Sequence, residues 1–136
     1  MVICDDKSKL KRIDPGKMFI KESQVKIKTL NAFIPFLSNK HIALIKIDIE
    51  GHEFEVFEGG KELITKYHVP FLMIEYETSF LEGHGTEVLE FLQFFENNGY
   101  KISLNDFFSK QYTSPSEIIT NKNILNLFIV YEKFLE

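Results

Sequence analysis

The chain has 136 residues, of which 44% are hydrophobic and 26% are charged, a composition typical of one folded domain and unlike that of disordered or fibrous proteins. The formal net charge of −4 is uneven, because residues 1–30 carry 8 basic and 4 acidic side chains while the remainder carries 8 and 16. The acidic body argues against a nucleic-acid partner, which needs a basic face. A single cysteine, Cys4, excludes an intrachain disulfide, and no apolar stretch approaches the roughly 18 residues of a membrane span. We therefore expect a cytoplasmic protein with no membrane partner.

Residues 1–24 are polar and basic, so we expect an irregular lead-in there, followed by a single domain over residues 25–136. A brief helix is predicted from Thr29 to Leu37, limited by Pro35. Residues Ile42 to Asp48 then form a continuous apolar run, which is typical of a strand covered on both faces of its sheet.

Helices and strands alternate through the rest of the chain. We expect one broken helix or two short helices at 53–66, strands at 71–76, 101–104 and 125–131, and a helix at 86–98 that ends at Gly99. A polar loop that contains residues 112–115 is expected between the last two strands. This alternation predicts an α/β fold.

The apolar strand at 42–48 ends in a group of polar side chains. Asp48 and Glu50 are two residues apart and project to the same side of an extended chain. In parallel sheets ligands bind beyond the carboxyl ends of the strands. The candidate catalytic residues are Asp48, Glu50, Glu53 and Glu75, and the candidate substrate-binding residues are His52, Glu77 and His84. Each of these residue types also suits a solvated turn, and the carboxylates with His52 are compatible with a magnesium or manganese site.

A spaced set of motifs resembles the FkbM-type methyltransferases. Its central part is the run Lys46-Ile47-Asp48-Ile49-Glu50-Gly51-His52-Glu53, followed by Gly59. Three further segments are similar to the family pattern, namely Thr29-Leu30-Asn31, with Asn31 in place of the usual acid, Phe71 to Glu77, and Asn98-Gly99-Tyr100. The resemblance covers roughly residues 25 to 131.

The resemblance implies a Rossmann-like class I methyltransferase fold with a mostly parallel sheet and an antiparallel last strand. It also implies methyl transfer from S-adenosylmethionine, with a hydroxyl oxygen of a sugar or small metabolite as the acceptor. The chain departs from the pattern in one respect, because none of its seven glycines forms the glycine-rich turn that lets a backbone approach the cofactor. We therefore expect a truncated version of the fold that corresponds to its C-terminal half.

Two alternatives to an active methyltransferase follow from the missing turn and from the acidic cluster. The first is a catalytically inactive fragment or protein-interaction module, and the second is a divalent-metal-dependent hydrolase. Loss of a neighbouring strand would also leave the strand at 42–48 at an apolar sheet edge. We expect either that the lead-in segment folds over this edge or that another chain, a second copy or a partner, pairs with it.

Overall fold

The computed structural model describes residues 26–49, 52–76, 85–121 and 124–135, and the side chains of residues 85–87 lie outside that description. Its centre is a sheet in the order β1-β2-β4-β3, formed by β1 (Leu44–Ile47), β2 (Phe71–Glu75), β3 (Tyr100–Ser103) and β4 (Asn126–Tyr131). β1 pairs with β2 in parallel, whereas β4 is antiparallel to both β2 and β3. The predicted antiparallel last strand is confirmed, and the described sheet is mixed.

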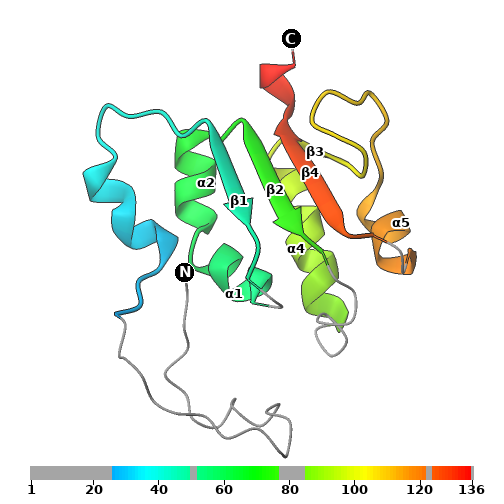
Figure 1. The fold of residues 1–136 in the computed structure, drawn as a ribbon, viewed down its shortest axis with the longest axis horizontal. Helices are drawn as coiled ribbons and strands as arrows, with labels where there is room; N and C mark the ends of the chain where they lie inside the picture. The colour runs from blue at the N-terminus through cyan, green and yellow to red at the C-terminus, as the bar shows by residue number, and fades with distance from the viewer. Residues whose placement is uncertain (1–25, 50–51, 77–84, 122–123, 136) are drawn as a thin grey trace, which may run out of the picture.

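Helices connect the strands and make the chain an α/β protein (Figure 1). They are η2 (Leu30–Phe36), α1 (Glu53–Glu58), α2 (Lys61–Tyr67), α4 (Gly85–Asn97), α5 (Pro115–Thr120) and η3 (Glu132–Phe134). The interruption at Gly59-Gly60 separates two short helices, which is one of the two arrangements predicted for this segment. Gly99 has a φ of +80° and ends α4, as its sequence position indicates.

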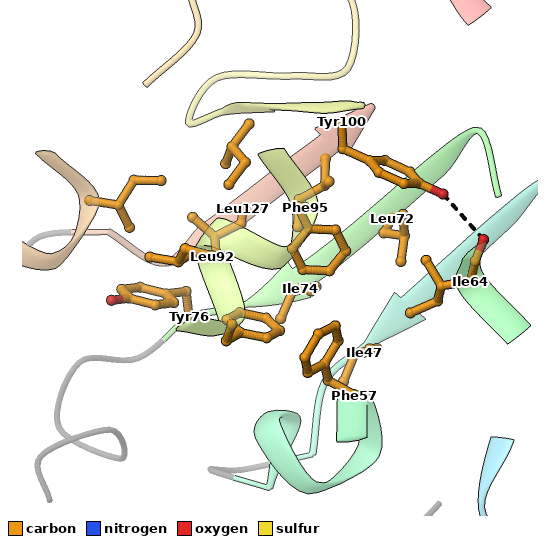
Figure 2. Packing of buried hydrophobic residues seen from close by; sticks show 14 of the residues in the cluster. Ile47, Phe57, Ile64, Leu72, Ile74, Tyr76, Leu92, Phe95, Tyr100 and Leu127 are labelled. Carbon is orange, nitrogen blue, oxygen red and sulfur yellow. Dashed lines mark hydrogen bonds between the residues drawn. The ribbon is translucent and has the colours of Figure 1, made fainter. Parts of the chain in front are cut away.

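One face of the sheet is covered by helices and holds the core. Figure 1 shows α2 and α4 running behind the strands. Leu72, Ile74, Leu127 and Ile129 point to this face and are at most 1% exposed. Figure 2 shows Phe57 from α1 and Phe95 from α4 packed among these strand residues, with the Tyr100 hydroxyl donating a hydrogen bond to the Ile64 carbonyl at 3.3 Å. This apolar layer fixes the register of all four strands, because a slip of one residue would turn every buried side chain outward.

The opposite face is only partly covered by the described residues. Near the amino end of β2 the ring of Phe71 packs against three aromatic rings, those of Phe107, Phe108 and Phe134. Leu44 on the edge strand is 51% exposed. Toward the carboxyl ends of β1 and β2 the same face carries Lys46 and Glu75 instead of aromatic rings.

Two predictions about local structure need correction or stay outside the description. The prediction of a polar loop between the last two strands is wrong in part, because Pro115–Thr120 form α5. Ser114 caps this helix, and the Glu117 carboxylate accepts hydrogen bonds from the Ser114 amide at 2.9 Å and from its hydroxyl at 2.7 Å. These contacts form a capping box. The hydrogen bonds that the box adds at the helix N-terminus stabilise a helix although the segment is polar. The lead-in at 1–24 lies outside the described residues, and within the described ranges no helix is long and apolar enough to cross a bilayer.

Candidate functional site

Three charged side chains meet where β1 and β2 end. The Lys46 ammonium donates a hydrogen bond to the Asp48 carboxylate, with 2.5 Å between Nζ and Oδ2. The Asp48 carboxylate also shares a hydrogen bond with the carboxyl group of Glu75, and the negative charge of Glu75 acts on Lys46. We call Lys46, Asp48 and Glu75 the strand-end cluster.

The parallel register of β1 and β2 brings this cluster together. Ile47 pairs with Ile74, so Asp48 and Glu75 follow at equivalent positions one residue later. Alternation places Lys46 and Asp48 on the same side of β1, away from the buried Ile47. The expectation that Glu75 lies beside Asp48 is therefore met.

The electrostatics of the cluster favour an ionised Asp48. The hydrogen bond from Lys46 is the largest influence that lowers the pKa of Asp48, followed by the hydrogen bond to Glu75 and the charge of Lys46. In turn, the hydrogen bond and the charge of Asp48 raise the pKa of Lys46. The lysine and aspartate side chains remain 54% and 43% exposed, so solvent and a ligand can both reach them.

Glu53 is buried and bonds to the backbone at the end of β1. It is 7% exposed, and its Oε1 accepts a hydrogen bond from the Ile49 amide at 3.1 Å. This bond ties the first residue of α1 to the chain leaving β1. His52, in contrast, is exposed and lies 3.7 Å from the Glu55 carboxylate, measured from Nδ1 to Oε1.

Asn31, which stands where the family pattern has an acid, also has a structural contact. Its Oδ1 accepts a hydrogen bond from the Leu63 amide at 3.0 Å, within the first turn of α2. Its own amide donates to the Gly59 carbonyl at 2.8 Å. An N-terminal helix amide thus receives its acceptor from a residue distant in sequence, because the adjacent Gly60 has no side chain to supply one.

The remaining candidates, Glu50, Glu77 and His84, lie outside the described residues. Across the described ranges no group of three His, Cys, Asp or Glu side chains could hold a metal ion. Two residues that border the site are not among the predicted site residues. Lys46 bonds directly to Asp48, and Asn126 pairs with Glu75 across the β2–β4 ladder. Lys46 could have been found from the same i, i+2 alternation that selected Asp48 and Glu50.

The sequence also matches a known protein family. The family model described as the methyltransferase FkbM domain matches residues 5–102. The match includes most of the segment predicted as a lead-in and ends in β3, before β4. Comparisons with curated proteins and with solved structures gave no match.

Proposed function

Because the chain belongs to the FkbM methyltransferase domain family, we propose that it acts in methyl transfer from S-adenosylmethionine to a hydroxyl oxygen of a sugar or small metabolite. The observation that carries the proposal is the strand-end cluster. It gathers one cation and two carboxyl groups beyond the carboxyl ends of β1 and β2, where ligands of α/β sheets bind.

The cluster suits the acceptor side of such a reaction. An acceptor hydroxyl can donate its hydrogen bond to the ionised Asp48 carboxylate, which fixes the direction of the oxygen lone pairs. Lys46 keeps Asp48 ionised, and the lowered pKa of Asp48 suits this carboxylate to orienting the hydroxyl more than to acting as a strong base. The hydroxyl proton that methyl transfer displaces would pass by way of Asp48 to solvent, which reaches this half-exposed carboxylate. Orientation of the reacting groups supplies much of the rate in transfers of this kind.

The described residues do not form a cradle for S-adenosylmethionine. A cofactor cradle needs glycines whose open side faces the ligand. At Gly60 an added Cβ would lie 2.9 Å from Leu30 Cδ1, and at Gly59 it would lie 3.1 Å from Thr29 Cβ. The chain's own side chains therefore occupy the space beside these two glycines. Gly99 precedes β3 at its amino end, away from the cluster. We assign the described residues to the acceptor side only.

Calorimetric titration of the folded chain with S-adenosylmethionine and S-adenosylhomocysteine tests the proposal. A dissociation constant of about 1 μM, or −8.2 kcal/mol, would mean that this chain or an assembly of it completes a cofactor site. The Asp48→Asn variant should keep that affinity, because Asp48 is assigned to the acceptor. Absence of heat and of a melting-temperature shift at millimolar ligand would overturn methyl transfer by this polypeptide alone. The inactive interaction module would then be the better account.

A partner across the sheet edge is part of the same proposal. Within the described sheet β1 is paired with β2 alone, and Leu44 on it is 51% exposed. Sedimentation velocity of the wild type and of Leu44→Lys would test it, with Ile119→Lys on the exposed side of α5 as the control. A self-associating wild type that only Leu44→Lys dissociates would support the edge contact, and a monomeric wild type would exclude a homodimer.

A further inference from the structure

A hollow of about 470 Å³ lies at the same edge of the sheet, on the β3–β4 side. Its lining residues come from the turn after β3, from the end of α5 and from β4, and they are Leu104, Asn105, Asn121, Ile124, Leu125, Asn126 and Phe128. A volume of this size falls within the range of about 300–1,000 Å³ that small-molecule sites occupy. None of the lining residues was selected from the sequence.

The described lining residues combine carboxamides with apolar side chains, and none of them is charged. Asn105, Asn121 and Asn126 each carry an amide that can both donate and accept hydrogen bonds. Ile124 is 5% exposed, so the hollow has an apolar inner part beneath its amides. Paired donors and acceptors above apolar surface match a ligand with several neutral hydroxyl groups on a carbon ring. An anionic ligand would find no counter-charge among these residues.

Two of the amides are held in place by the fold. Asn126 is in β4, in register with Glu75 of β2. At the rim, the Asn105 backbone amide donates to Ser103 Oγ at 3.2 Å, and its side-chain Nδ2 donates to Gln111 Oε1 at 3.1 Å. Ser103 is completely buried, which anchors the turn that carries Asn105. Preorganised polar groups of this kind reduce the entropy lost on binding.

The hollow and the strand-end cluster are neighbours on one face. Residues directly opposite in an antiparallel pair have Cβ atoms about 4.5–5.5 Å apart and point to the same side. Asn126 and Glu75 form such a pair, and Glu75 shares its hydrogen bond with Asp48. A ligand bound beside Asn126 would therefore present a hydroxyl group toward the carboxyl groups.

We propose that this asparagine-lined hollow binds a neutral, polyhydroxylated ring such as a monosaccharide unit. Its identification as the part of the methyl acceptor next to Asp48 rests on the proposed function. Binding of the ring does not, because it needs neither the cofactor nor the carboxylates.

The experiment is a ¹⁵N-¹H NMR titration of the full chain with methyl β-D-glucopyranoside and, separately, with the corresponding glucuronide. The two probes share a ring and differ by one carboxylate. The neutral probe should move the side-chain amide signals of Asn105, Asn121 and Asn126 saturably, with a dissociation constant on the order of 1–10 mM. The glucuronide should bind at least several-fold more weakly, because none of the described lining residues carries a positive charge.

Variants distinguish specific binding at this site from non-specific binding elsewhere on the protein. Asn126→Leu keeps the side-chain size and removes the amide, so we expect about a tenfold or greater loss of affinity, equal to 1.4 kcal/mol or more. Asn97→Leu, at an exposed position at the end of α4, is the matched control and should bind as the wild type does. If Asn126→Leu fails to fold, Asn105→Ala at the exposed rim replaces it.

Three results would overturn the proposal: no asparagine signal moves at about 100 mM glucoside, well above the expected dissociation constant; both probes bind equally; or Asn126→Leu and Asn105→Ala both bind normally. Failure to bind S-adenosylmethionine would leave the sugar titration interpretable. Loss of sugar binding with intact cofactor binding would refute only the proposal that the hollow binds a sugar.

Discussion

The two faces of the sheet differ in what covers them. On the helical face the strand side chains meet α2 and α4 and are excluded from water, as for Leu72 and Leu127 at 0% exposure. On the other face Leu44 is half exposed, and Lys46 and Asp48 remain open to solvent. The difference indicates that one face specifies the fold and that the carboxyl end of the other face is available for ligands.

This division has a physical reason. Burial of large apolar side chains supplies most of the folding free energy, so the covered face tolerates few substitutions. Charged groups could not occupy that face without a desolvation cost that a small domain cannot offset. A chemical site is therefore confined to the face and edge that the helices leave uncovered.

The largest expected effect is a loss of stability on substitution of a core residue of the covered face. Phe95 is 0% exposed and packs against Phe57, Phe91, Phe94 and Tyr100. Phe95→Ala should lower the free energy of unfolding by about 3–5 kcal/mol, because it removes buried surface and leaves a cavity. Urea denaturation measures the loss.

The matched control for Phe95→Ala lies on the other face. Phe108 is 78% exposed, with a single ring contact to Phe71 at 6.0 Å between centroids. Phe108→Ala should change stability by at most about 0.5 kcal/mol. Equal losses of unfolding free energy in the two variants would mean that both faces contribute alike to stability. The proposed difference between the faces would then be wrong.

A smaller effect is expected for the cap that Asn31 supplies. Asn31→Ala removes the acceptor of the Leu63 amide and should cost about 0.5–2 kcal/mol. Asn31→Asp restores an acceptor and adds a negative charge at a helix N-terminus, so it should be at least as stable as the wild type. If both variants lost stability equally, the carboxamide nitrogen, and not the cap, would be the important group.

Next in size is the buried hydroxyl of Tyr100. Tyr100→Phe removes the hydrogen bond to the Ile64 carbonyl and should cost about 0.5–1.5 kcal/mol. Tyr112→Phe, at a residue 42% exposed, should be neutral. Chemical denaturation of both variants at neutral pH distinguishes them.

Tyr100 also makes stability depend on alkaline pH. Burial, followed by the charge of Tyr131, raises the pKa of Tyr100 above its ordinary value. The neutral form is therefore favoured in the folded state. Stability from this group is fully present below the unfolded pKa of about 10 and is lost as the pH rises through the folded pKa. The wild type should lose more stability above pH ~10 than Tyr100→Phe does.

Much of the covered face was predictable from the sequence, because apolar runs and helical spacing report burial directly. The strands at 44–47 and 71–75 and the break at Gly59-Gly60 follow from such local patterns. The polar content of the segment before β4 favours a loop and does not predict α5, although Ser114, Pro115 and Glu117 carry a capping signal.

The site was predictable only in part. Asp48 and Glu75 could be placed together because they end two apolar strands, which is a local signal. The backbone contact of Glu53 and the bond from Leu63 to Asn31, 32 residues away, depend on tertiary packing that one sequence does not encode locally. The hollow joins the turn after β3 to β4, two segments whose contact follows only from the order of strands in the sheet.

The last prediction concerns the open face and involves no expected loss of fold. Lys46 is the largest cause of the lowered pKa of Asp48, so Lys46→Met should raise the Asp48 titration midpoint toward the ordinary value of about 3.9. Carbon-detected NMR titration of the Asp48 carboxyl group measures the midpoint. Because the folded pKa is lowered, the stability from Asp48 is present above its unfolded pKa and is lost as the pH falls through the folded one.

Lys66→Met, in the exposed last turn of α2, controls for the general loss of one positive charge and should leave the midpoint unchanged. The hydrogen bond that Asp48 shares with Glu75 should keep the Lys46→Met midpoint below that of the double variant with Glu75→Leu, whose side chain forms no hydrogen bond. An unchanged midpoint in Lys46→Met would show that the lysine does not act on Asp48 in solution. The open face would then be a solvated surface, and its contrast with the buried face would carry no chemical meaning.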